Sequence, residues 1–319
     1  TRFRKQSKHL LECTKRAVEM AIKQDGQSAI KYLESEKSNM KEEVAMKFID
    51  PRIDFAFKKI FGGEDTKDIL MNFIESLLDL SGNKKLKDIT ILDPFAAPRV
   101  KGLKLSIIDV KCTDLRGVSY IVEMQVKKTK AFFKRIQYNA AKTYANQIAK
   151  GEDYPKLNQV IAVTVTGFTL FEELDAYVTR HATQETETGK EYLSEIIYYV
   201  VELSKFEKKI ETLDNVLDKW IWFIKYASEI EKIPDNMKED VFIHAFEKAR
   251  LANMTPLELE YYDKASMTIA DEIGAMELAK EEAEKAGMEK GIKKGMEKGK
   301  QEQQKSIAKK NESERIFSR

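Results

Sequence analysis

The sequence predicts an α/β domain with a mixed β-sheet, flanked by helical segments on both sides. Residues 66–79 place apolar side chains at helical spacing, as an amphipathic helix does. Three segments of strand-type composition follow, separated by turn residues: 89–92, 103–113 and 118–127. A helical segment and an apolar strand come next: 132–149 and 159–166. A hairpin meander followed by a helix and a strand is the order of a two- or three-layer α/β domain.

The chain divides into four expected parts: a helical arm (1–45), the α/β domain (46–204), a helical C-terminal region (205–274) and a charged tail of low complexity (275–319). Within the second part, 172–191 is expected to be a helix or a loop, and 195–202 a strand. In the tail, Ala or Gly recurs every four residues among Lys and Glu. Because each Gly costs a helix about 1 kcal/mol relative to Ala, a marginal, solvated helix is expected. The arm or the tail could pair with a second copy of the chain.

Composition limits the classes of protein and of site. Of the 319 residues, 42% are hydrophobic and 34% charged, which supplies a core under a charged surface. The net charge of +2 means that any contact with nucleic acid must use local basic patches. The two cysteines, Cys13 and Cys112, cannot form a disulfide framework, and the three histidines lie too far apart to suggest a zinc site. No apolar run approaches a membrane span, so a cytoplasmic protein is expected.

The segment 105–127 is a predicted hairpin with one acidic face. Read with a period of two, Ile108, Val110 and Cys112 share an apolar face, whereas Asp109 lies on the opposite one. The turn residues Asp114-Leu115-Arg116-Gly117 favour a three-residue loop with Gly117 in the left-handed conformation. That loop pairs residue 114 with residue 118. Counting back along both strands then places Asp109 opposite Glu123.

Two opposed carboxylates point to a divalent cation. Directly opposed side chains have Cβ atoms about 4.5–5.5 Å apart, and carboxylates at that distance repel each other unless a cation lies between them. Mg²⁺ or Mn²⁺ is the expected cofactor, because hard cations prefer oxygen ligands. Gln125, two residues after Glu123, could orient a water molecule but brings no positive charge. The alternative is an ordinary solvated strand face, although Ile107 and Ile121 on the same face favour a covered site.

The motif Ile108-Asp109…Glu123-Met124-Gln125 resembles that of the Rpn family of recombination-promoting nucleases and transposases, a branch of the PD-(D/E)XK nuclease superfamily. The resemblance covers about residues 46–270. Its further blocks are Phe48–Gly62, which is similar to the family's opening helix, Arg135–Tyr138 and Tyr144–Tyr154 from its helix after the motif, and Pro155–Phe171 around its next strand.

This resemblance implies a core of helix, three strands, helix and strand, and Mg²⁺-dependent cleavage of DNA linked to recombination or mobile elements. It implies that Asp109 and Glu123 are metal ligands and that Gln125 occupies the position of the superfamily lysine. The chain departs from the superfamily pattern because no proline precedes Asp109 and because Gln replaces Lys. Lys111 or Lys127, on the same face, could supply the missing cation.

Further candidates lie on either side of the motif. Asp54 could add a third carboxylate to the metal site, or could be an exposed first-turn residue favoured by the helix dipole. A basic set that suits DNA phosphates consists of Lys111, Lys127, Lys128, Lys130, Lys134 and Arg135. Two other functions stay open: a catalytically weak DNA-binding or assembly protein with the same fold, and an interaction protein that acts through its arm and tail.

Overall fold

The computed structural model describes residues 12, 14–19, 30–32, 47–92, 95–96 and 106–317. Two compact units make up the chain, Thr1–Tyr262 and Asp263–Arg319. The helical arm expected at 1–45 therefore lies almost entirely outside the described residues.

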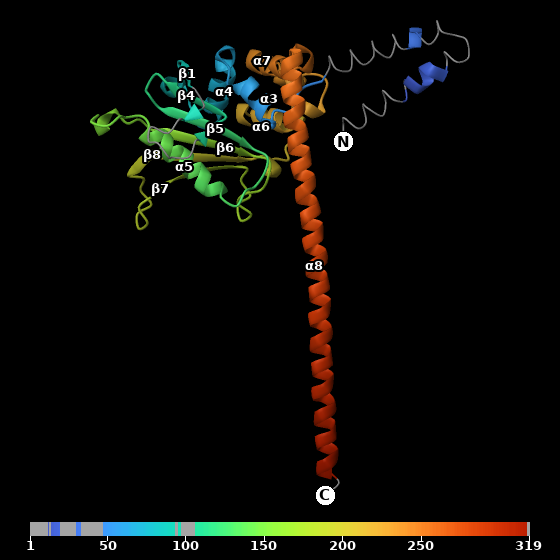
Figure 1. Ribbon diagram of the computed structural model, residues 1–319. Helices are drawn as coiled ribbons and strands as arrows, with labels where there is room; N and C mark the ends of the chain where they lie inside the picture. Colours follow the sequence, from blue (N-terminus) through green and yellow to red (C-terminus); the bar gives the residue numbers. More distant parts are fainter. Residues whose placement is uncertain are drawn as a thin grey trace. The chain divides into compact units, whose positions relative to one another are not determined.

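A six-stranded mixed sheet forms the centre of the first unit, with the strand order β1-β4-β5-β6-β8-β7 (Figure 1). Its strands are β1 (Ile89–Leu92), β4 (Val110–Asp114), β5 (Ser119–Gln125), β6 (Val160–Thr166), β7 (Val178–Thr183) and β8 (Leu193–Glu202). β5, β6 and β8 run parallel to one another, and the outer pairs are antiparallel. A separate two-stranded ribbon joins β2 (Phe95–Ala96) to β3 (Ser106–Ile107).

Helices cover both faces of this sheet. α5 (Phe132–Ala145) crosses one face and packs on β6 and β8. The other face is covered by α3 (Asp54–Phe61), α4 (Lys67–Leu77), α6 (Val216–Tyr226) and α7 (Asp240–Ala249) (Figure 1). Because the sheet is covered twice, every residue of β6 is buried, and the strand reads as a continuous apolar run rather than an alternating one.

The aromatic centre of the helical layer lies around Trp220 of α6. Its ring is fully buried and packs against Phe61 of α3, Phe73 of α4 and Phe242 of α7. The indole Nε1–H donates to Asn72 Oδ1 over 2.8 Å, so the polar atom of this buried ring is satisfied. This cluster holds α3, which contributes residues to the site described below, firmly against the rest of the unit.

The expectation for residues 172–191 was wrong in part, because they contain strand β7. This strand pairs with β8 at the edge of the sheet, with a register irregularity between His181 and Thr183. None of its six residues is buried, so its sequence lacks the apolar alternation of the inner strands. An edge strand needs only one hydrogen-bonded neighbour, and charged residues on such a strand discourage pairing with other chains.

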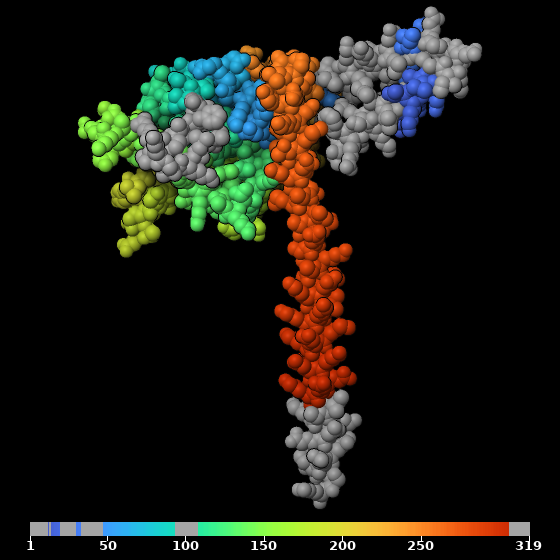
Figure 2. Space-filling view, viewed as in Figure 1, coloured from blue at the N-terminus to red at the C-terminus, as the bar shows by residue number. Residues whose placement is uncertain are grey.

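The expected C-terminal helical region forms α6, α7 and the start of α8 (Pro256–Phe317). α8 continues as one helix through the second unit, where a marginal helix was expected from its glycines. Every side chain from 271 to 305 is exposed, and Figure 2 shows them projecting around the helix. Within the described part of the chain, no helix is both long and apolar enough to cross a membrane.

The hairpin between β4 and β5 has the predicted register. Val110 pairs with Val122 and Cys112 with Tyr120, and the Asp114 N–H donates to the Val118 carbonyl over 3.1 Å. Gly117 closes the three-residue loop with a φ of 85°. A Cβ atom at residue 117 would lie 2.7 Å from Asn158 Nδ2, so both the backbone conformation and the space require glycine here.

We expect Gly117→Ala to lower the free energy of unfolding more than Gly189→Ala does. Both residues have positive φ, which costs a side chain about 1–2 kcal/mol, but nothing lies within 4 Å of a Cβ at residue 189. At residue 117 the methyl group also displaces Asn158 from its hydrogen bond to the Lys156 carbonyl, which adds about 1 kcal/mol. Urea denaturation of the two variants measures the difference, and equal losses would contradict this account.

Candidate active site

Asp109 lies in a bend directly before β4, beside the residue that follows Glu123 on β5. Its Oδ2 accepts a hydrogen bond of 2.7 Å from the backbone N–H of Met124. The side chain is 15% exposed, which is low for a carboxylate. The pairing of β4 with β5 ends at Val110 and Val122, and Asp109 and Glu123 are the next residues beyond this pair.

Helix α3 brings a second carboxylate and an ammonium group to Asp109. Asp54 and Lys58 are one helical turn apart, and Lys58 Nζ lies 2.8 Å from Asp54 Oδ1 and 3.6 Å from Asp109 Oδ1. Burial, together with the neighbouring Asp54 carboxyl, raises the pKa of Asp109 to about 7. The Met124 N–H and the Lys58 charge act in the opposite direction. Two carboxylates thus share one cation in a largely buried place.

Glu123 points toward α5 and is 8% exposed. Its Oε1 accepts a hydrogen bond from Asn139 Nδ2. Burial raises the pKa of Glu123, whereas the charge of Arg135 and the bond from Asn139 favour its ionised form. Arg135 and Asn139 are four residues apart and therefore lie on the same face of α5.

Arg135 is the cation that contacts Gln125, whereas the sequence suggested Lys111 or Lys127 for that role. Its Nη2 donates to Gln125 Oε1. Its Nε is buried and has no hydrogen-bond partner within the described part of the chain. The positive charge next to Gln125 is therefore carried by a helix. Lys128, Lys130 and Lys134 are exposed around the start of α5.

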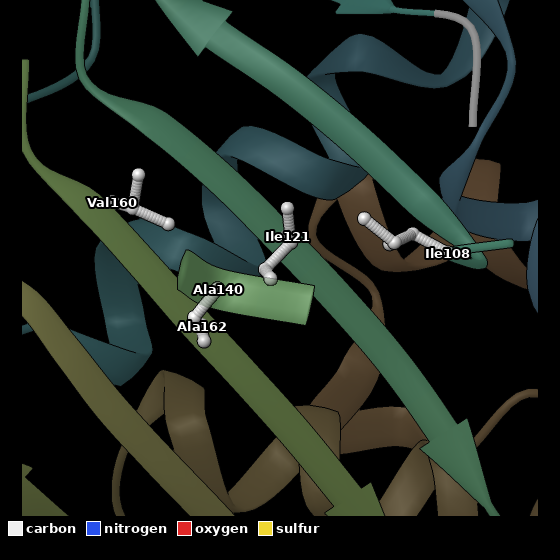
Figure 3. Close-up of a cluster of buried hydrophobic side chains, with 5 residues drawn as sticks. All are labelled: Ile108, Ile121, Ala140, Val160 and Ala162. Carbon is white, nitrogen blue, oxygen red and sulfur yellow. The ribbon is translucent and has the colours of Figure 1, made fainter. Parts of the chain in front are cut away.

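Two expectations about side-chain faces were wrong. Asp109 and Glu123 were expected to share a face, but the partners of Asp109 come from α3 and β5, and those of Glu123 come from α5. Ile108 packs with Ile121 and Ala140 in the cluster beneath α5 rather than with Val110 (Figure 3). The bend at Asp109 explains both, because a residue outside the strand does not follow its alternation.

The donor set fits a hard divalent cation, although it is not a complete cage. Asp54, Asp109 and Glu123 offer only oxygen ligands, and burial leaves the charge on Asp109 and Glu123 undercompensated. Among the described residues, no three acidic, histidine or cysteine side chains converge closely enough to hold a metal on their own. Mg²⁺ is typically held by one or two carboxylates, with waters and substrate phosphates as the other ligands.

Sequence reasoning missed Lys58 and Asn139, which touch the candidate carboxylates. Both could have been found from helical spacing. Lys58 follows Asp54 by four residues in a helix expected beside the motif, and Asn139 follows Arg135 by four. The sequence alone could not tell which carboxylate each would meet, because that depends on how the helices pack on the sheet.

The sequence matches the family described as PD-(D/E)XK nuclease family transposase over residues 51–279. This match spans more than half of the 319 residues. The chain belongs to this family. No curated protein and no solved structure matches it significantly. Membership agrees with the mixed sheet and the helices described above, and nucleases of the PD-(D/E)XK superfamily generally use divalent metals.

For this PD-(D/E)XK family member we expect Asp109→Asn to stabilise the metal-free protein at pH 8. Since the pKa of Asp109 is raised in the folded state, the wild type loses stability as the pH rises from about 4 through 7. An amide removes that loss, which is worth about 1–3 kcal/mol at pH 8 and little at pH 4. Denaturation at both pH values, with the exposed Asp175→Asn as control, measures the effect.

The same measurement includes a metal arm. Mg²⁺ at pH 8 should raise the melting temperature of the wild type and leave that of Asp109→Asn almost unchanged, because a ligand stabilises only the form that binds it. A destabilised Asp109→Asn at pH 8 would show that the carboxylate is a structural group with adequate partners.

Proposed function

We propose that the chain is a Mg²⁺-dependent (or Mn²⁺-dependent) DNA endonuclease linked to recombination or mobile elements. The observation that carries this proposal is the buried Asp109 carboxylate, which lies one residue beyond the last β4–β5 pair, as Glu123 does, and is short of positive charge. Carboxylates with strongly shifted pKa values are concentrated at functional sites. Burial of an unpaired carboxylate destabilises the fold, so its presence points to a functional role.

Asp109 would be the central ligand of the metal, and Asp54 approaches it from α3. Glu123 points toward α5 and would act on the metal through a bound water molecule, because no three carboxylates converge among the described residues. A bound divalent cation lowers the pKa of a water molecule and neutralises charge on the phosphate. Lys58, which contacts both Asp54 and Asp109, balances part of their charge in the metal-free protein. The Met124 N–H fixes the orientation of Asp109 throughout.

Gln125 and Arg135 together would take the role of the superfamily lysine. The Gln125 side chain is positioned by Arg135 and can hydrogen-bond the attacking water. The Arg135 guanidinium remains charged at any relevant pH, and it can donate two bonds to the phosphate on which negative charge develops. The hydrogen bond from Asn139 orients Glu123 and favours its ionised form against the effect of burial, which raises the pKa of Glu123. The exposed lysines Lys128, Lys130 and Lys134, with the partly buried Lys111 and Lys127, would contact the DNA backbone.

A catalytically weak DNA-binding or assembly protein is the second candidate. The observation that favours it is Gln125 itself, which carries no charge and already accepts a bond from Arg135. If Arg135 only supports Gln125 and does not reach the phosphate, the site binds DNA and metal but turns over slowly.

Nicking of a supercoiled plasmid distinguishes the two candidates. With Mg²⁺ the wild type should nick the plasmid, and Asp109→Ala or Glu123→Ala should reduce the rate by roughly 100-fold or more, because each removes an electrostatic interaction with the transition state. The exposed Asp175→Ala and Glu187→Ala are the matched controls. Nicking without metal, or undiminished nicking by both site variants, would refute the mechanism. Binding of plasmid without nicking by the wild type would favour the second candidate.

The role of Arg135 has its own test. Arg135→Gln should lower the cleavage rate constant about 100-fold while DNA affinity changes little. Lys134→Gln should weaken DNA binding and leave the cleavage rate constant unchanged, because Lys134 is exposed and lies outside the Glu123–Gln125 contacts. Adding Gln125→Lys to Arg135→Gln should restore part of the rate by returning the charge to the strand. If Arg135→Gln lowers only the affinity for DNA, Arg135 contacts the DNA backbone and has no role in cleavage.

A further inference from the structure

A polar pocket of about 350 Å³ lies where β4 and β5 meet the C-terminal end of α5. β4 and β5 contribute Lys111, Thr113 and Ser119 to its lining, and α5 contributes Thr143. Asn146, which caps α5, and Lys156, in the segment before β6, complete the polar wall. None of the roles proposed above uses this pocket as a unit.

The pocket has hydrogen-bonding groups that the protein leaves unused. Thr143 is 2% exposed, and its Oγ1 has no hydrogen-bond partner in the described part of the chain. The side chains of Thr113, Ser119 and Asn146 likewise have no hydrogen bond within the described residues. A buried hydroxyl without a partner costs about 1–3 kcal/mol, so an orphaned group in a pocket indicates that something from outside satisfies it.

The unused groups can all donate, and two of the acceptors in the same wall, the Asp114 carboxylate and the Gln147 amide oxygen, are occupied. Asp114 accepts from the Arg116 and Val118 N–H groups with Oδ1, and from the Arg116 guanidinium and the Tyr120 hydroxyl with Oδ2. Gln147 exchanges two hydrogen bonds with the backbone of Asn158. What remains is three hydroxyls and one amide. The same lining includes Lys111 and the exposed Lys156, whose ammonium group pairs with Glu152 over 3.2 Å. That set is suited to an oxyanion, and a phosphate ester supplies several acceptor oxygens and a negative charge.

The pocket and the candidate active site lie along one face of the same elements. On β5, Ser119, Ile121 and Glu123 point to the α5 side, and the first and last are about 13 Å apart at the rise of a strand. On α5, Arg135, Asn139 and Thr143 follow at intervals of four residues. The distance between Ser119 and Glu123 corresponds to about four base-pair steps of B-DNA along its axis. One DNA strand can therefore contact both the pocket and the candidate active site.

We propose that this pocket binds a phosphate group of the DNA strand whose scissile phosphate lies at Glu123. The inference rests on the proposed DNA-cleaving function, because it identifies the ligand as substrate backbone. A free nucleotide would present the same phosphate chemistry and is the other source to be distinguished.

The test measures binding without cleavage, so that it can be read even if the wild type does not cut DNA. A labelled 20-base-pair duplex is titrated into the full chain in Ca²⁺ at several salt concentrations. Thr143→Val removes the hydroxyl with little change in volume, and Lys156→Gln removes one charge. Thr90→Val, on the exposed side of the edge strand β1, and Lys190→Gln, in the β7–β8 loop, are the matched controls. Unlabelled dTMP serves as competitor in a second arm.

Thr143→Val should weaken duplex binding about 10-fold, and Lys156→Gln should weaken it and lower the salt slope by about 1, because one phosphate contact is lost. The controls should bind like the wild type, and millimolar dTMP should not displace the duplex. Displacement by dTMP that Thr143→Val abolishes would confirm the phosphate site but assign it to a free nucleotide. Wild-type affinity and salt slope in both variants, without competition by dTMP, would overturn the proposal.

Discussion

The register of the β4–β5 hairpin is the constraint on which the rest of the site depends. It is fixed at the turn, where Asp114 receives hydrogen bonds of 2.9 Å from the Arg116 N–H and 3.1 Å from the Val118 N–H. Gly117 supplies the left-handed residue that a three-residue loop needs. A slip of one residue would turn Glu123 to the opposite face of the sheet and separate it from α5. The chemistry at one end of the hairpin is therefore set by the turn at the other end.

The buried carboxylates of this fold are satisfied to different degrees, and the difference marks the site. Glu202, fully buried at the end of β8, accepts from the Leu170 and Phe171 N–H groups and pairs with Lys205. Asp109 has one backbone N–H, a longer contact to Lys58 and a second carboxylate beside it. Since a buried ion is tolerated only when it is well paired, Glu202 has the partners of a structural group, and Asp109 lacks them. A cation would supply what Asp109 lacks.

The sequence predicted the parts of the structure that local patterns control. The strand composition, the amphipathic helix at 66–79 and the Asp114–Gly117 turn each depend on a few neighbouring residues, and all three agree with the structure. The bend at Asp109 was not predictable, because a single residue outside the strand leaves no mark on the alternation. Strand β7 was missed because its stability comes from pairing with β8 rather than from apolar residues of its own. The contact between Arg135 and Gln125 depends on how α5 packs on the sheet.

Because the positive charge lies on α5 and not on the strand, the packing of the helix determines its position. A lysine at residue 125 would be held by the hairpin alone, whereas Arg135 is held by the helix that Ile136 and Ala140 anchor against the sheet. Asn139, on the same face, holds Glu123, and Thr143, one turn further, lines the polar pocket. The packing of one helix therefore sets three features together: a cation beside the motif, the orientation of a carboxylate and one wall of the polar pocket. A rigid helix keeps these groups at fixed spacing, as recognition of a regularly spaced phosphate backbone requires.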